Sequence, residues 1–147
     1  MRYNNLVNFE FYYGQTRRAS EQNLDFIDFI FIGNDFGSQR ALLLSPAHWR
    51  DYYKPHLKKM VDLAYRHGTV AGLHSCGDIH SIFPDLIEIG MDAVNPIQVN
   101  AEHMDPVVLK REYGKDIVFF GGIDENVILF TAPNSRRATR PAASSTF

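Results

Sequence analysis

Short hydrophobic runs alternate with amphipathic stretches along most of the chain. Four runs rich in β-branched and aromatic residues predict strands, at residues 26–32, 69–74, 92–95 and 117–120. The first run is apolar at nearly every position, a pattern typical of a strand buried on both faces of a parallel sheet. Each run ends in polar residues or glycine, so the sequence predicts buried strands with polar ends.

Amphipathic segments between these runs predict helices. The first, residues 45–68, has a Ser-Pro start and a Gly end, and Pro55 within it predicts a kink or two abutting helices. Residues 79–90 predict a second helix, whose first turn is expected to be separate because of Pro84. Residues 105–114 predict a third, again with an N-cap followed by proline and a terminal glycine.

The resulting order, β-α-β-α-β-α-β, fits either an open doubly wound sheet or part of a (βα)8 barrel. A complete barrel needs about 200 residues or more, so the length of 147 favours half of a TIM barrel, an α/β unit of four parallel strands. We assign this unit to residues 25–130. Residues 1–24 are poorly defined, with residues 6–13 either a strand or the end of a helix, and residues 131–147 resemble a flexible tail.

Composition limits the partners and the compartment. Hydrophobic residues make up 45% of the chain and the net charge is −2, which gives no attraction for nucleic acid or an anionic membrane. There is neither an apolar run of the roughly 20 residues that a membrane span needs nor a signal peptide. The single cysteine, Cys76, excludes an internal disulfide and fits a reducing compartment, so we expect a cytoplasmic protein.

Candidate chemistry follows from the rule that ligands lie beyond the carboxyl ends of parallel strands. His74 and Cys76 are two residues apart, which on an extended backbone places both side chains on the same side. An imidazole and a thiolate suit Zn²⁺, with Asp35, Asp124 or another histidine as a third ligand. The alternative is a hydrogen-bonded buried histidine beside a small apolar cysteine. A Cys–His nucleophile pair is disfavoured because no third group orients it.

Two other strand-end features are open to two interpretations. Gly121-Gly122 permits close approach of the backbone to a ligand, but also a simple sharp turn, and it lacks the spacing of a dinucleotide-binding fingerprint. Asp35 and Asp124 are either acids that face a ligand or caps of the segments that follow them.

Five blocks then occur in a specific order: residues 34–39 (NDFGSQ), 45–49 (SPAHW), 73–77 (LHSCG), 90–98 (GMDAVNPIQ) and 120–124 (FGGID). Together they resemble the second half of the uroporphyrinogen decarboxylase superfamily, which includes the heme-pathway decarboxylase and cobalamin-dependent methyltransferases. The resemblance covers about residues 25–130 and implies a (βα)8 barrel.

Within that superfamily the H-x-C-G block resembles the methyltransferase branch. The resemblance implies that His74 and Cys76 hold a zinc ion that activates a thiol, and that a corrinoid serves as methyl donor or acceptor. The expected substrate is thus a small molecule or a corrinoid protein. The positions expected to bind substrate are Asp35, Gln39, Asn95, Gln98, Gly121, Gly122 and Asp124.

The chain departs from this pattern in two ways. The methyltransferase pattern has another cysteine nearer the C-terminus, whereas Cys76 is the single cysteine of this sequence. The decarboxylase takes its substrate-binding arginine and its aspartate from the first half of the barrel, to which none of the five blocks corresponds. A decarboxylase-type lyase of porphyrin biosynthesis and an inactive, truncated barrel fragment are therefore the alternatives. A half barrel would expose two sheet edges and an apolar face, which predicts a homo-oligomer or a complementing half barrel.

Overall fold

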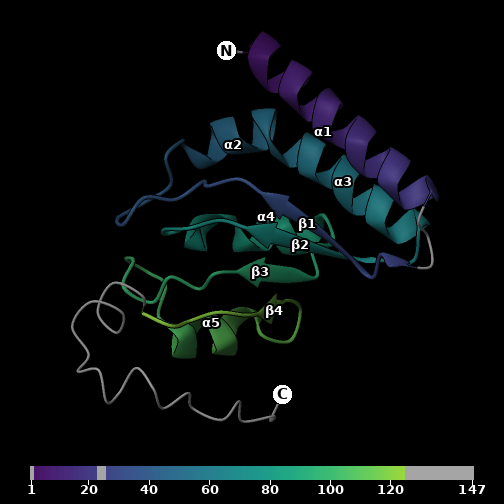
Figure 1. Cartoon of the computed structure of the whole chain (residues 1–147). Coiled ribbons are helices and arrows are strands. Elements are labelled where there is room, and N and C mark those ends of the chain that lie inside the picture. Colours follow the sequence, from purple (N-terminus) through teal and green to yellow (C-terminus); the bar gives the residue numbers. More distant parts are fainter. Residues whose placement is uncertain (1, 23–25, 125–147) are drawn as a thin grey trace, which may run out of the picture.

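A four-stranded parallel sheet forms the centre of the computed structural model, which describes residues 2–22 and 26–124. The strands lie in the order of the sequence, so each crossover returns the chain beside the strand it has just left (Figure 1). Gly33 pairs with His74 and His74 with Asn95, so the carboxyl ends of three strands are level. The strands are β1 (Phe29–Gly33), β2 (Val70–His74), β3 (Ala93–Asn95) and β4 (Val118–Phe119).

Helices cover one face of this sheet, and we call this the outer face. Alternate strand residues such as Ile30, Leu73 and Val94 point outward into a core shared with Trp49 and Phe83 from the helices. The element order confirms a βα half barrel. The helices after β1 are α2 (Pro46–Tyr52), α3 (Lys54–Arg66), a 3-10 turn η2 (His80–Ile82), α4 (Phe83–Glu88) and α5 (Pro106–Tyr113).

The local helix signals are confirmed. The Ser45 hydroxyl accepts from the backbone N–H of His48 at the start of α2, and the break expected near Pro55 falls at Tyr53, which separates α2 from α3. The turn expected before α4 is η2. The carboxylate of Asp105 caps α5 by accepting from the N–H groups of its first turn.

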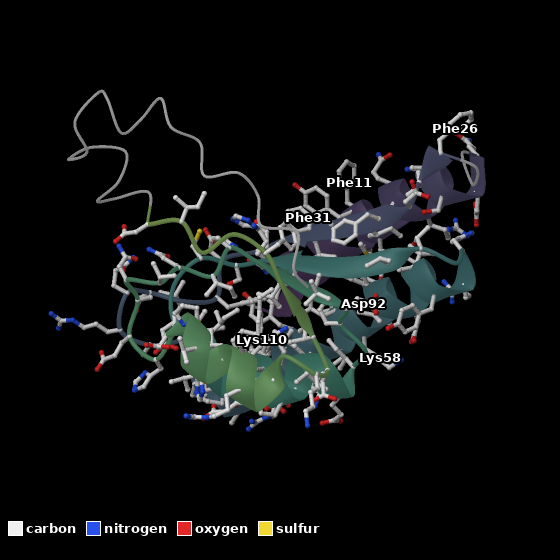
Figure 2. The ribbon with its side chains drawn as sticks, turned by 90° about the horizontal axis from the view of Figure 1, so that it is seen from below. Phe11, Phe26, Phe31, Lys58, Asp92 and Lys110 are labelled. Carbon is white, nitrogen blue, oxygen red and sulfur yellow. The ribbon has the colours of Figure 1, made fainter. Side chains whose placement is uncertain are left out.

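The predicted first strand is wrong in its start and in its burial. The strand begins at Phe29, because pairing with β2 begins there, and Phe26 is 86% exposed. The expectation of burial on both faces also fails. Phe29 and Phe31 point to the side of the sheet that no helix covers, which we call the inner face, and Figure 2 shows Phe31 on the side opposite α5, which carries Lys110.

Residues Arg2–Gln22 form a helix, α1, which decides the open choice for residues 6–13. It lies alongside α3 on the β1 side of the sheet (Figure 1). The Phe9 ring packs on His56 at 4.4 Å, and Arg66 Nη2 donates to the Tyr13 hydroxyl at 2.9 Å. No helix among residues 2–22 and 26–124 has the length and apolarity to cross a membrane. The tail at 131–147 lies outside the described residues.

A nearly buried carboxylate joins α2, α3 and α4. Asp85 accepts from Arg50 Nε at 3.0 Å and from Lys54 Nζ at 2.8 Å. Burial alone would raise the pKa of Asp85, but the hydrogen bonds and charges of the two cations hold it below its ordinary value. The carboxylate therefore stabilises the helical layer in its ionised form.

Candidate functional site

The polar ends of the strands meet at one edge of the sheet. Because all four strands are parallel, the loops after β1, β2, β3 and β4 leave from the same edge. The backbone ties neighbouring ends together: Asn34 N–H donates to the carbonyl of His74 at 3.0 Å, and Ser75 N–H to that of Asn95 at 2.8 Å. The predicted site residues near these ends lie on one rim.

Asp35, His74 and Cys76 bring three possible metal-ligand atoms together. Within the described part of the chain they form a group whose ligand atoms all lie within 4.8 Å of one another. Cys76 Sγ lies 3.7 Å from His74 Nε2, which in turn lies 3.7 Å from Asp35 Oδ1. Of the third ligands left open by the sequence, the structure favours Asp35 over Asp124.

The tautomer of His74 follows from its neighbour Asn95. The amide nitrogen of Asn95 donates to the carbonyl of Phe120 at 3.1 Å, which turns its oxygen toward His74 Nδ1 at 3.2 Å. That oxygen can only accept, so a proton on Nδ1 satisfies this contact, and Nε2 is the ring nitrogen that faces Cys76 and Asp35. This is the arrangement of a metal-binding histidine oriented by an outer partner.

The loops after β1 and β2 are fastened to each other directly beneath these ligands. Cys76 N–H donates to Asp35 Oδ1 at 2.8 Å, and Phe36 N–H donates to the fully buried Ser75 hydroxyl at 2.9 Å. The backbones approach so closely at Gly37 that a Cβ there would lie 2.7 Å from the Asp78 nitrogen. Glycine is therefore required at this crossing.

The structure places the other predicted substrate-binding residues around this group with different roles. The Gln98 side chain accepts from Gly77 N–H at 2.7 Å, and so holds the turn after Cys76. Gly121 and Gly122 both have positive φ, 106° and 81°, and a Cβ at Gly121 would lie 3.2 Å from Pro96 Cα. The glycines thus serve both a turn and a close approach, here to the loop after β3.

Gln39 and Asp124 are less closely connected to the group. Gln39 is exposed, and its carbonyl accepts from Glu102 N–H at 2.8 Å. Asp124 follows β4 at the same edge and is half-buried, but it lies outside the three-ligand group. Neither position is held against His74 in the way that Asn95 is.

The donor set fits zinc in chemistry, and its two distances around His74 fit in spacing, while Cys76 Sγ and the Asp35 carboxylate lie within 4.8 Å of each other. Tetrahedral Zn²⁺ with bond lengths of about 2.0 to 2.3 Å holds nitrogen, sulfur and oxygen ligands about 3.3 to 3.6 Å apart. The two distances of 3.7 Å around His74 exceed this by a few tenths of an ångström at most. Side chains of His74 and Asp35 are 37% and 57% exposed, so a fourth ligand can approach from solvent.

Sequence reasoning missed an ion pair behind the site. The Asp78 carboxylate, nearly buried, accepts from the ring of His103 at 2.7 Å, and this hydrogen bond and charge raise the pKa of His103. His103 has a φ of 58°, in the left-handed region. A sequence pattern does not reveal this pair, because the two residues are 25 positions apart and lie on loops after different strands.

The fold and the rim define a βα-barrel type of protein, with parallel strands in sequence order and polar groups at their carboxyl ends. A family model described as uroporphyrinogen decarboxylase (URO-D) matches residues 21–142. The chain therefore belongs to the URO-D family, a family of TIM barrels, as its ordered blocks predict. Comparisons with curated proteins and with solved structures found no match.

Proposed function

We propose that this chain supplies the zinc-binding rim of a methyltransferase of the URO-D superfamily, which moves a methyl group between a corrinoid and a thiol. The observation that carries the proposal is the juxtaposition of Asp35, His74 and Cys76 at the carboxyl edge of the sheet. A decarboxylase would need no soft metal ligand here. A thiolate–imidazole–carboxylate set is a combination that zinc prefers.

Three protein ligands leave one tetrahedral position for a substrate, as in catalytic rather than structural zinc sites. Coordination to zinc would lower the pKa of a thiol at this position, so that it releases its proton to solvent at neutral pH and becomes a nucleophile. The chain's own residues prepare this position. Asn95 fixes the His74 tautomer, and the Cys76 N–H holds Asp35 Oδ1 beside the imidazole.

Metal analysis of the purified full chain tests the zinc site. We expect one zinc per chain, lost in His74→Ala and Cys76→Ala, and bound at least about tenfold more weakly in Asp35→Asn. Matched controls are His67→Ala and Asp116→Asn, at positions away from the rim, which should retain zinc. Retention of full zinc by Cys76→Ala would overturn the proposed site.

Spectroscopy of the cobalt-substituted chain tests the ligands themselves. With Co²⁺ in place of zinc, a sulfur-to-metal charge-transfer band should appear and should vanish in Cys76→Ser. Asn95→Leu should weaken metal binding by about tenfold to a hundredfold, whereas Asn95→Asp, which keeps an acceptor for His74 Nδ1, should retain it. Equal metal binding by Asn95→Leu and Asn95→Asp would contradict the role of Asn95 in orienting His74.

Activity separates this proposal from the decarboxylase alternative. Methyl transfer from methylcobalamin to a thiol, abolished by a chelator and restored by zinc, supports the methyltransferase. Release of CO₂ from a porphyrinogen that a chelator leaves unchanged would instead support a lyase. Zinc binding without either reaction would leave the chain as a metal-binding part of the barrel and contradict the proposed turnover.

A further inference from the structure

The inner face of the sheet is apolar toward the amino ends of the strands. It carries Phe29 and Phe31 from β1, with Val70, Val118 and Phe120 from the other strands, and these five side chains are between 39% and 57% exposed. Phe120 follows β4 and lies level with Asn95 at the polar rim, whereas the other four side chains lie closer to the amino ends of the strands. Amino-end positions inside a barrel are filled core rather than a ligand site. The inner face therefore has the apolar composition of one half of a barrel interior.

The sheet is curved toward this inner face. Phe120, beyond β4, lies 6.3 Å from Phe29 and 6.0 Å from Phe31, both on β1, measured between ring centroids. In a flat sheet β1 and β4 would be three spacings, about 14 Å, apart. Gly72 on β2 leaves the room, since a Cβ there would lie 2.3 Å from the Phe29 ring. The curvature is that of a barrel wall.

Both edges of this curved sheet lack a neighbouring strand within residues 2–22 and 26–124. β1 pairs only with β2, and β4 only with β3. Backbone groups of Asp28 and Asn34 bond to β2, so by alternation those of Phe29, Phe31 and Gly33 face the outer edge. Two apolar strand edges with free donors and acceptors favour pairing with further strands.

Helix α1 already lies where it would cover a strand added at β1. A cavity of about 560 Å³ lies between the β1 edge, α1 and α3, and its lining includes Phe9, Tyr12, Ile32, Tyr53 and Leu57. A strand beside β1 would direct its outer side chains into this cavity. Figure 2 shows Phe11 of α1 on the same side as Phe31, beyond the sheet edge. The β1 edge is thus prepared for a strand with apolar outer residues.

We infer that a second copy of this chain closes the barrel, with β4 of each copy beside β1 of the other. A twofold rotation about the barrel axis relates the two copies. It brings the β4 edge of each copy to the β1 edge of the other and keeps all eight strands parallel. The β4 strand has apolar residues on both faces, since Phe119 packs against the helical core of its own chain while Val118 and Phe120 are exposed on the inner face.

Charge and area agree with a second copy as the occupant. Asp92 borders this face, but its carboxylate is engaged by the Tyr65 hydroxyl and the Ala71 N–H, so it does not oppose the meeting of two inner faces. The five exposed side chains offer about 400 Å² per copy. A standard interface buries about 800 Å² per partner, so these side chains provide about half of it and the two strand pairings would have to provide the rest.

Oligomeric state and one pair of Val→Lys variants test this inference. The full chain should sediment at twice its 16.8 kDa over about 1 to 100 µM. Val118→Lys places a charge in the inner core and should weaken dimerisation by about a hundredfold or more. Val107→Lys, at a more exposed helix position outside the interface, should leave the dimer intact. Circular dichroism shows whether each variant keeps its helices, and Phe31→Lys repeats the test at the other edge.

The single cysteine reports the geometry of the dimer. Spin labels on Cys76 of the two copies should lie about 15 to 30 Å apart, across one barrel mouth. This measurement does not depend on zinc, so it can fail independently of the proposed function. A monomer at every concentration, as expected if residues 125–147 cover the inner face, would overturn the inference. So would equal weakening by both valine variants, or labels at opposite ends of the particle.

Discussion

Gly77→Ala should separate the two loops that hold the candidate metal ligands. The residue has a φ of 81°, and a Cβ there would lie 2.3 Å from the Gly37 carbonyl carbon and 2.6 Å from the Ser38 oxygen. Both are backbone atoms, so no side-chain rotation relieves the overlap. The loop after β2 must then move by about 1 Å relative to the loop after β1.

Two terms give the expected loss of unfolding free energy in Gly77→Ala. A non-glycine residue in the left-handed region costs about 1 to 2 kcal/mol. Separation of the loops also stretches the Asp78 N–H to Ser38 carbonyl bond, now 2.7 Å, and the bonds of Cys76 to Asp35 and Phe36 to Ser75. Loss of two such bonds at a buried site adds about 2 to 4 kcal/mol. We expect a decrease of about 3 to 6 kcal/mol in the free energy of unfolding.

Three other glycines separate these terms in the same chain. Gly68 has a φ of 68° and no atom within 4 Å of the place that a Cβ would occupy, so Gly68→Ala measures the backbone term alone. Gly37 has no such φ but the same close approach, so Gly37→Ala measures the overlap alone. Gly33 has neither and should change little.

Urea unfolding of the four variants, with zinc affinity measured in parallel, gives the comparison. The losses of unfolding free energy in Gly68→Ala and Gly37→Ala should sum approximately to the loss in Gly77→Ala. Only Gly37→Ala and Gly77→Ala should lose zinc affinity. A Gly77→Ala variant no less stable than Gly68→Ala would show that the loops do not touch as described.

Two ion pairs give predictions about pH. Because the pKa of Asp85 is lowered in the fold, its stabilising effect is present above the unfolded value of about 3.9 and is lost as the pH falls through the folded value. Asp85→Asn, which leaves Arg50 and Lys54 without their carboxylate, should cost about 3 kcal/mol at pH 7 and remove this acid dependence, as measured by urea unfolding from pH 7 to 3. The pKa of His103 is raised by Asp78, so its contribution is present below 6.5 and is lost as the pH rises through the folded value. NMR titration should place the His103 pKa above 6.5 and return it toward that value in Asp78→Asn; an unchanged titration would contradict the pairing.

Local patterns predicted the elements but not where pairing begins. Caps such as Ser45 and Asp105 act within one turn of helix, so the sequence shows them directly. The start of β1 was wrong because Phe26 and Ile27 have strand-forming side chains, whereas the strand needs a partner and Val70 is the first residue of β2. Burial on both faces failed because no helix of the described residues covers the side of the sheet that carries Phe29 and Phe31.

The candidate site was predictable only in part, for a related reason. The spacing of His74 and Cys76 is a property of one backbone segment, and parallel order brings Asn95 beside them. The selection of Asp35 over Asp124 depends on contacts between two loops, fixed by the Ser75 hydroxyl and the glycine crossing. Side-chain bonds between residues about 40 positions apart leave no periodic trace in a sequence.

The rim and the inner face differ in how far a single chain completes them. All three candidate ligands come from the loops after β1 and β2, and their orienting partner comes from the end of β3, so one copy supplies a complete metal-binding group. The core beneath them is different, because Phe29, Val118 and their neighbours are only half covered by their own chain. Metal binding therefore requires local loop contacts, whereas exclusion of water from the barrel interior requires strands from outside the described residues. Under the proposed function, closure of the barrel is therefore a requirement separate from assembly of the ligands.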